Sequence, residues 1–190
     1  MGSIVMENST MNNSVENVSI IERSDIKDIA LAEQGKNNIE WAFKNMPVLM
    51  RIKERFIKEQ PFKGLKLSAC VHITKETAAL CTVMQAGGAD AILVASNPLS
   101  TQDDVAAALV KYWGIPVLGY AGESVETYKS HVRAAMDHNP DIVIDDGCDI
   151  VATIHAERPE LAKKLIGSTE ETTTNRRSEE RFSRNAETDI

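Results

Sequence analysis

The sequence predicts an α/β fold in which a parallel sheet carries helices on both faces and a helical segment comes first. Up to about residue 60 the apolar residues recur at helical spacing, with no strand pattern between them. Beyond that point short apolar runs alternate with helical patterns of about 10 to 14 residues, which is the order typical of βαβ units. The runs are apolar throughout, as strands are when helices cover both faces of their sheet.

The N-terminal helical segment is expected to begin near Ile26. Ser24 and Asp25 precede it, and short oxygen-bearing side chains cap helices by accepting hydrogen bonds from the first free amides. Gly35 and Pro47 are predicted to divide the segment into three helices, because glycine weakens a helix and proline interrupts it.

Strands and helices then alternate along the chain. The five apolar runs expected to be strands are 65–72, 91–95, 115–119, 142–144 and the short run 165–166. The segments expected to be helices are 74–85, 101–113, 125–136 and 155–163. Because each crossover returns the chain in the same direction, we expect a parallel Rossmann- or flavodoxin-like sheet.

Composition argues against several classes of protein. At 190 residues, of which 43% are hydrophobic, the chain is large enough for one domain with a real core. The net charge of −7 argues against nucleic acid as a partner, since phosphate binding needs clustered lysine and arginine. No apolar run approaches the ~18 residues needed to span a membrane, and the N-terminus is unlike a secretory signal.

Cysteine and histidine spacing indicates no metal site. Cys70, Cys81 and Cys148 form no C-x-x-C pair, and no H-x-x-x-H spacing occurs. Scattered cysteines of this kind are typical of reduced thiols, so we expect a cytoplasmic protein. The chain also has no G-x-G-x-x-G, the glycine-rich turn with which many α/β domains bind dinucleotides.

Polar side chains gather where the expected strands end. In an open parallel sheet the carboxyl ends of the strands meet at one edge, and ligands bind there. The polar strand ends are His72-Ile73-Thr74, Ser96 to Asp103, Asp145-Asp146-Gly147 and Ser168 to Thr172. This clustering predicts a binding site at that edge.

Each of these residues also has a purely structural interpretation. Thr74 can simply cap the helix that follows, and Ser100 with Asp103 matches a capping box. His72 can be a hydrogen-bonded core histidine, and Asp145-Asp146-Gly147 can be a plain turn. The remaining histidines, which fall in or beside helices, are expected at the surface: His131, His138 and His155.

Four of these motifs, in this order, resemble the S-adenosylhomocysteine hydrolase family. They are His72 to Thr77, Ser96 to Asp103, Asp145-Asp146-Gly147 and Glu170-Glu171-Thr172-Thr173-Thr174, within a resemblance that runs from residue 25 to residue 174. The resemblance implies NAD-dependent, reversible hydrolysis of S-adenosyl-L-homocysteine to adenosine and L-homocysteine, a step of one-carbon metabolism. NAD would oxidise the ribose 3′-hydroxyl, so that homocysteine can be eliminated and water added before the sugar is reduced again.

The resemblance also implies roles for individual residues. Asp146 would be the catalytic acid and base near the sugar 5′ carbon, with His72 beside it. Thr74 and Glu76 would contact the nucleoside, Glu76 at the adenine amino group, while Glu171 would bind the ribose hydroxyls. The residues that would shape the substrate pocket are Asn97, Ser100 and Gln102. The residues that would reach NAD are Thr172, Thr173 and Thr174.

The expected domain limits rest on the same resemblance. We expect residues 1–20, rich in Asn, Ser and Glu, to be a disordered tail, and residues 21–174 to be a substrate-binding domain. The family continues with a glycine where this chain has Asn175, and its NAD-binding domain has no counterpart here. Residues 175–190 resemble a translated sequencing adapter and are interpreted as a non-native tail.

Two interpretations of the chain's activity stay open. In the first, the chain is an inactive fragment of an adenosylhomocysteinase, whose complete form the resemblance implies to be a cytoplasmic homotetramer that acts on small molecules. In the second, it is a free-standing α/β module that binds a nucleoside without catalysis. A glycine-rich dinucleotide-binding domain encoded in frame downstream would favour the first, and a native stop near residue 175 would favour the second.

Overall fold

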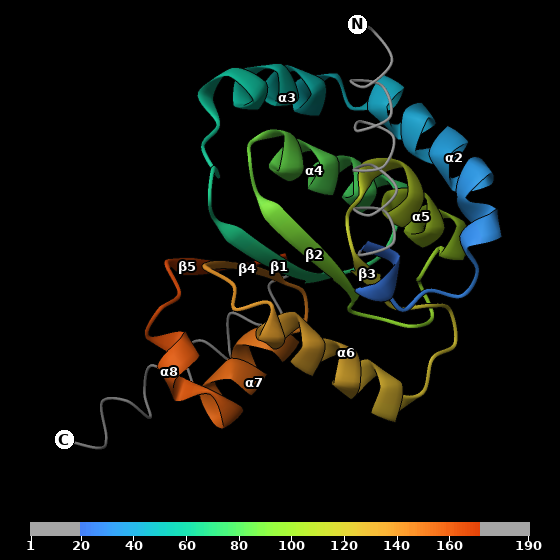
Figure 1. Ribbon diagram of the computed structural model, residues 1–190. Helices are drawn as coiled ribbons and strands as arrows, with labels where there is room; N and C mark the ends of the chain where they lie inside the picture. The colour runs from blue at the N-terminus through green and yellow to red at the C-terminus, as the bar shows by residue number, and fades with distance from the viewer. Residues whose placement is uncertain (1–19, 172–190) are drawn as a thin grey trace, which may run out of the picture.

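The computed structural model describes residues 20–171, which form one sheet and the helices around it (Figure 1). Apart from Ile20, the expected tails lie outside these residues, as do Thr172 to Thr174. Within the described range all strands run parallel in the order β3-β2-β1-β4-β5, which confirms the predicted α/β sheet. The strands are β1 (Lys66–Val71), β2 (Asp90–Ala95), β3 (Val117–Leu118), β4 (Ile142–Asp145) and β5 (Gly167–Glu170).

The helices lie on both sides of the sheet, as predicted (Figure 1). On one side are α2 (Ala32–Asn45), α3 (Pro47–Glu59), α4 (Lys75–Ala86) and α5 (Asp103–Ala108). On the other side are α6 (Val125–Asp137), α7 (Asp149–Glu157) and α8 (Pro159–Ala162). A short 3-10 helix, η1 (Ile29–Leu31), precedes α2, and a π-helical turn, η2 (Leu109–Trp113), extends α5. None of the helices in residues 20–171 has both the length and the apolar character needed to cross a membrane.

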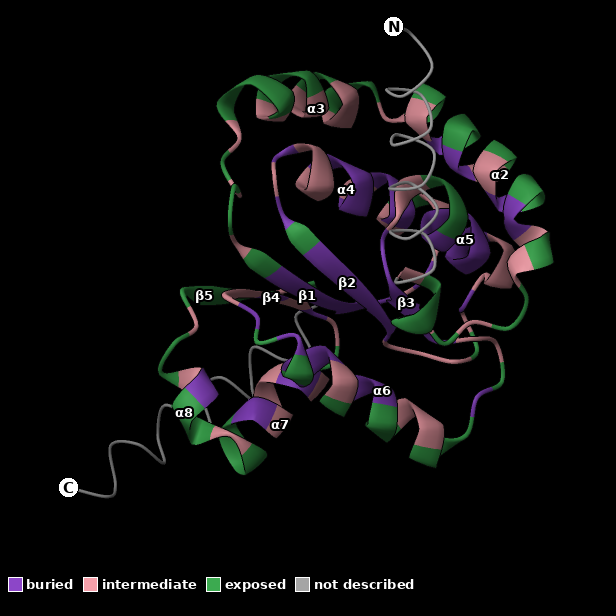
Figure 2. Ribbon diagram, in the orientation of Figure 1, coloured by how far each residue is buried: buried purple, intermediate pink, exposed green. Residues whose placement is uncertain are grey.

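The sheet separates two apolar cores, one on each face. Successive strand residues point to opposite faces, so Leu67 and Ala69 of β1 enter the core that contains α2, α4 and α5. Cys70 of the same strand enters the second core, with residues of α6, α7 and α8. Figure 2 shows β1 and β2 buried between the two layers beyond their exposed first residues. Burial on both faces explains why the runs are apolar throughout.

The first helix does not begin at Ile26. Asp25 instead pairs in parallel with β3, as an extended residue at the edge of the sheet. The cap is Asp28, whose Oδ1 accepts the Ala30 N–H at 2.8 Å at the start of η1. The predicted Ser24 and Asp25 cap is wrong because the short edge strand β3 offers free backbone groups with which an extended segment can pair.

Helix α2 runs unbroken through Gly35, so of the two predicted breaks only Pro47 divides the N-terminal helices. Gly35 is buried where α2 crosses the start of α5, and a Cβ added to it would lie 1.8 Å from the carbonyl oxygen of Asp104. The glycine therefore permits close helix packing rather than ending a helix. Glycine lowers the stability of a helix by about 1 kcal/mol relative to alanine, and the close packing of α2 against α5 outweighs this loss.

The predicted capping box of Ser100 and Asp103 does not form. Helix α5 starts after Gln102 without a side-chain cap. Asp103 instead accepts the Ala121 N–H at 2.7 Å and pairs with Lys27 Nζ at 3.3 Å. The Asp103 carboxylate therefore binds the loop after β3, which lies too far along the chain for a local sequence pattern to indicate the contact.

Two elements near the described C-terminal end differ from their predicted positions. The helix predicted at 155–163 begins earlier, at Asp149, and Pro159 divides it into α7 and α8. The last strand is Gly167–Glu170 instead of 165–166. This strand is largely exposed, so it has no apolar pattern by which its position could be predicted.

Two histidines expected at the surface are buried. His131 is 4% exposed and His138 is 8% exposed, whereas His155 is exposed as predicted. His131 lies between two carboxylates, with Nδ1 2.9 Å from Glu123 Oε2 and Nε2 3.0 Å from Asp25 Oδ2. Burial raises the pKa of the Glu123 carboxyl. These carboxylates come from segments outside α6, so helical periodicity gave no sign that His131 would be buried between them.

Candidate active site

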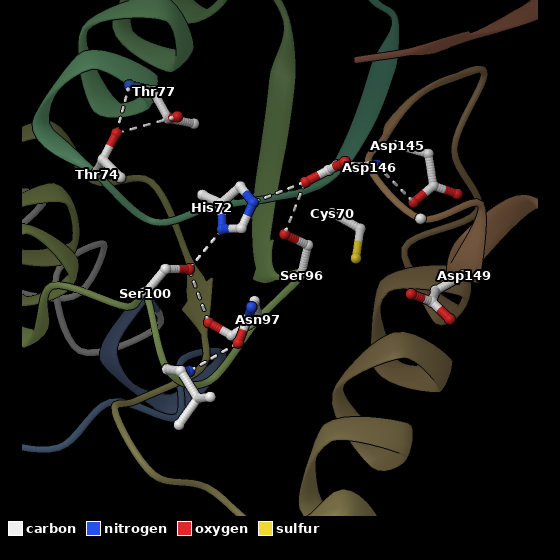
Figure 3. Close-up of polar contacts among 12 residues, drawn as sticks. Cys70, His72, Thr74, Thr77, Ser96, Asn97, Ser100, Asp145, Asp146 and Asp149 are labelled. Atoms are coloured by element: carbon white, nitrogen blue, oxygen red, sulfur yellow. Dashed lines mark hydrogen bonds and ion pairs between the residues drawn. The ribbon is translucent and has the colours of Figure 1, made fainter. Parts of the chain in front are cut away.

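The strand order reverses between β1 and β4. From β1 the chain moves to β2 and β3 on one side, and it then returns to β4 on the other side of β1. Loops that follow the two strands at such a reversal diverge, and ligands bind between them. His72 follows β1 and Asp146 follows β4, so the two residues face each other at this point (Figure 3).

His72 and Asp146 are in direct contact. His72 Nε2 lies 3.0 Å from Asp146 Oδ2, and their side chains are 39% and 11% exposed. Ser96, directly after β2, donates its hydroxyl to the same carboxylate oxygen at 3.4 Å. The main-chain N–H of Asp146 donates to the Cys70 carbonyl at 2.9 Å. The pair is thus held in place and is still accessible to a small molecule.

The second ring nitrogen of His72 contacts Ser100. His72 Nδ1 lies 2.5 Å from Ser100 Oγ, and that hydroxyl donates to the Asn97 carbonyl at 3.1 Å. Ser100 and Asn97 belong to the loop after β2, in which the Leu99 N–H closes a turn on Asn97 Oδ1 at 2.9 Å. The loops after β1, β2 and β4 therefore supply one continuous chain of polar contacts that ends at Asp146 (Figure 3).

Three other predicted substrate residues lie on or beside helix α4. Thr74 caps α4 and accepts the Thr77 N–H at 3.4 Å, as its structural interpretation predicts. Gln102 Oε1 accepts the Lys75 N–H at 3.3 Å, which ties the loop after β2 to the start of α4. Glu76 is exposed on the first turn of α4, beside Lys75. Thr74 and Gln102 thus support the loops, whereas the Glu76 carboxylate is open to solvent.

Asp145 supports the site through hydrogen bonds to the backbone around it, and it was not predicted as a site residue. It is fully buried, with Oδ1 accepting the Asp146 N–H at 3.1 Å and Oδ2 accepting the Val151 N–H at 3.0 Å. Its carbonyl accepts the Glu171 N–H at 2.9 Å. Burial raises the pKa of the Asp145 carboxyl to about 6. Strand alternation was the available signal, because Asp145 shares a face with the buried Val143.

We expect Asp145 to make stability depend on pH. Its carboxyl binds a proton more tightly in the folded chain than in the unfolded chain, where the pKa is about 3.9. The stabilisation from Asp145 is therefore fully present below about pH 4 and is lost as pH rises through about 6. The unfolding free energies of wild type and Asp145→Asn, measured with urea, should change relative to each other by roughly 2 kcal/mol between about pH 4 and about pH 7.

Asp137→Asn is the matched control for this measurement, because the Asp137 side chain is 65% exposed. Its difference from wild type should stay nearly constant over the same range. A pH-independent difference for Asp145→Asn would show that the buried carboxyl does not take up a proton as the fold requires.

The turn after β4 is hydrogen-bonded to the last residue of β5. Gly147 has φ 106° and Cys148 has φ 61°, in the left-handed region that favours glycine. The Gly147 N–H donates to Glu170 Oε1 at 2.9 Å. Glu171, the last described residue, is exposed, and its N–H is held by the Asp145 carbonyl. The residue expected to bind ribose therefore lies at the same edge of the sheet as the His72 and Asp146 pair.

The described residues form no cradle for a dinucleotide. Such a cradle needs glycines in the turn before the first helix, so that phosphates can approach the helix N-terminus. Here that turn carries His72 and Thr74, and the Thr74 side chain itself caps α4. Within residues 20–171 no three His, Cys, Asp or Glu side chains are placed to hold a metal ion. The described site can bind a polar small molecule and move a proton between an imidazole and a carboxylate.

Comparison with known proteins agrees with this geometry. The protein-family model for S-adenosyl-L-homocysteine hydrolase matches residues 23–189. The chain belongs to the S-adenosyl-L-homocysteine hydrolase family. The family resemblance predicted from the four strand-end motifs is thereby confirmed.

Three curated relatives show how this member of the S-adenosyl-L-homocysteine hydrolase family compares in sequence. The chain is 58% identical over 152 residues to an adenosylhomocysteinase of Thermosynechococcus vestitus, and 59% identical over 150 residues to one of Aquifex aeolicus. It is 47% identical over 149 residues to an S-inosyl-L-homocysteine hydrolase of Methanothermobacter thermautotrophicus. These matches cover 80%, 79% and 78% of the chain, and 35%, 36% and 36% of the relatives. The chain therefore spans about a third of the length of these relatives.

Proposed function

We propose that the protein containing this chain reversibly hydrolyses S-adenosyl-L-homocysteine to adenosine and L-homocysteine. The observation that carries the proposal is the 3.0 Å contact between His72 Nε2 and Asp146 Oδ2 at the reversal point of the sheet. Family membership supports the reaction class, and the relatives named adenosylhomocysteinase support the substrate.

The pair suits the two proton transfers that cleavage of a thioether by water needs. A leaving thiolate must gain a proton, and the water that replaces it must lose one. Asp146 would face the sugar 5′ carbon, and His72 would hold the proton between the two transfers. The hydroxyl of Ser96 supports this role because it keeps the carboxylate turned toward the imidazole.

Binding of the nucleoside is proposed for residues around the pair. Glu76 would accept a hydrogen bond from the adenine amino group, and its exposed position on α4 leaves the carboxylate available. Glu171 would accept hydrogen bonds from two ribose hydroxyls, and Thr74 would also contact the nucleoside. The residues proposed to shape the pocket are Asn97, Ser100 and Gln102.

The complete protein is proposed to use NAD, which would be held by residues outside the described range, Thr172 to Thr174 among them. NAD would supply the reversible oxidation of the sugar, and the described residues provide no place for that step. Residues 21–174 would be the substrate-binding domain. We further propose a cytoplasmic homotetramer that acts on small molecules, without a nucleic-acid or membrane partner.

A second substrate is suggested by the relative named S-inosyl-L-homocysteine hydrolase. Adenine offers an amino group and hypoxanthine offers a ring N–H, and a carboxylate such as that of Glu76 can accept a hydrogen bond from either. Glu76 alone therefore does not decide between them. The higher identity to the adenosylhomocysteinases, 58% against 47%, favours the adenosyl substrate.

Homocysteine release, measured with a thiol reagent, tests the proposal. The complete protein loaded with NAD should release homocysteine faster from S-adenosyl- than from S-inosyl-L-homocysteine. The 190-residue chain should release none from either, even with added NAD. Release by this chain alone, or none by the complete protein, would contradict the proposal, while a preference for the inosyl substrate would select the second candidate.

A further inference from the structure

We propose that Ser100 is a positioning residue that sets the protons of the His72–Asp146 pair. It makes His72 carry a proton on Nδ1, so that one more proton is held between Nε2 and Asp146 Oδ2. The catalytic meaning of this arrangement rests on the proposed function, but its chemistry follows from hydrogen bonds within the described residues. Ser100, expected to line the substrate pocket, would then act through His72.

The Ser100 hydroxyl has one proton to donate and two neighbours that contact it. The Asn97 carbonyl oxygen, 3.1 Å away, can only accept. His72 Nδ1, 2.5 Å away, can either accept or donate, depending on the tautomer. Both contacts are hydrogen bonds only if Ser100 donates to Asn97 and accepts from a protonated Nδ1. The reverse arrangement would leave the contact with Asn97 without a proton.

The loop after β2 holds the Asn97 carbonyl in the position that this arrangement needs. Thr101 Oγ1 donates to the same carbonyl at 3.1 Å, and the Leu99 N–H donates to Asn97 Oδ1 at 2.9 Å. The carbonyl is therefore directed at the hydroxyls of both Ser100 and Thr101. Ser100 is held as a donor to the backbone and presents its lone pairs to His72.

This arrangement also fixes what the other ring nitrogen of His72, Nε2, can do. A neutral imidazole protonated on Nδ1 has a bare Nε2, which here faces Asp146 Oδ2 at 3.0 Å. Two lone pairs at that distance repel, so a proton lies between them, either on Nε2 beside a carboxylate or on Oδ2 beside a neutral ring. In both cases the pair holds one proton more than a neutral histidine beside a carboxylate.

This extra proton is the one that the proposed reaction uses first. In the elimination, a base outside the described residues would take the 4′ hydrogen as a proton, the 4′–5′ double bond would form as the bond between sulfur and the 5′ carbon breaks, and the thiolate would take its proton from the pair. In the addition, the water oxygen would bond to the 5′ carbon, one water proton would return to the pair, and the 4′ carbon would regain its proton from that base. Without the hydrogen bond from Nδ1 to Ser100, the ring can carry its proton on Nε2 beside a carboxylate, and the pair starts with one proton fewer.

Two-bond ¹H–¹⁵N NMR spectra of the 190-residue chain test the proton arrangement without substrate or cofactor. Such spectra show which imidazole nitrogens are protonated, and the signals of His72 are identified by their loss in His72→Gln. We expect these spectra to show a proton on His72 Nδ1. A bare Nδ1 with a protonated Nε2 would overturn the proposal.

Three variants separate positioning from general disturbance. In Ser100→Ala the ring should change to the form protonated on Nε2, whereas Ser100→Thr keeps a hydroxyl and should keep the wild-type form. Ser124→Ala, which removes the distant cap of α6, should leave His72 unchanged. The loop should persist in Ser100→Ala because Thr101 still donates to Asn97. An unchanged Nδ1 in Ser100→Ala counts against the proposal.

Kinetics of the complete protein provide the functional measurement. Ser100→Ala should lower kcat for homocysteine release roughly tenfold with little change in KM, and Ser100→Thr should restore most of it. If the protein does not hydrolyse the proposed substrate, the NMR result for the chain is unaffected. If the protein is an active hydrolase but Ser100→Ala keeps the wild-type proton arrangement and kcat, the positioning role is wrong.

Discussion

Asp146→Asn is expected to lower kcat of the complete protein by roughly 100-fold to 10,000-fold, the range that a positioned acid and base contributes. The amide has the shape of the carboxylate, but it cannot take up and release a proton, so the pair with His72 no longer transfers one. The fold should survive, because the Asp146 N–H remains bonded to the Cys70 carbonyl and to Asp145 Oδ1. Steady-state kinetics and urea unfolding of the same preparations measure the two properties.

Asp137→Asn is the matched control for a lost aspartate charge. Asp137 is exposed at the end of α6, where it pairs with Arg158 rather than with His72, and its loss should leave kcat near the wild-type value. Turnover of Asp146→Asn at the level of this control would remove Asp146 from the proposed acid–base role. Loss of turnover together with a large loss of unfolding free energy would point to a structural role instead.

Gly35→Ala is expected to destabilise the chain by about 3 kcal/mol or more, because overpacking at a fixed backbone contact is among the costliest core changes. The added Cβ would lie 1.8 Å from the Asp104 carbonyl oxygen, so α2 and α5 must move apart. Helix propensity predicts the opposite sign, since alanine favours a helix over glycine by about 1 kcal/mol. Urea unfolding of the 190-residue chain therefore decides between tertiary packing and local preference.

Gly167→Ala is the control for this change. Gly167 lies on the exposed strand β5, and nothing lies within 4 Å of a Cβ added to it. Its substitution should change the unfolding free energy by less than about 0.5 kcal/mol. If Gly35→Ala proves as mild as this control, or stabilises the chain, the close approach of α2 and α5 is not a constraint on the fold.

Helices and strands could be predicted where buried apolar residues form a regular pattern along the sequence. The strands β1, β2 and β4 lie within a residue or two of their predicted positions, because helices bury them on both faces. β5 was misplaced because its residues are mostly exposed and carry no such pattern. The caps at Ser24 and Ser100 were wrong for another reason, since each side chain found a partner from a different element.

The candidate site could be predicted in part, because polar residues after apolar strands stand out. His72 and Asp146 are predicted in this way, and the structure brings them into contact. Asp145 is also an aspartate and lies directly beside Asp146 in the sequence. The alternation of residues along β4 nevertheless buries it. Ser96 and Ser100 were visible as polar residues, but their hydrogen bonds to Asp146 and His72 join segments that are distant along the chain.

The sequence by itself determined the α/β class, the parallel direction of the strands, the polar strand ends and the family, because hydrophobic periodicity and ordered motifs are local properties. Only the tertiary structure decided which strand ends meet. The order β3-β2-β1-β4-β5 places the loop after β1 beside the loop after β4, and that neighbourhood creates the His72 and Asp146 pair. Periodicity records which face of an element is buried but not which element covers it, and the proton arrangement of a site depends on those neighbours.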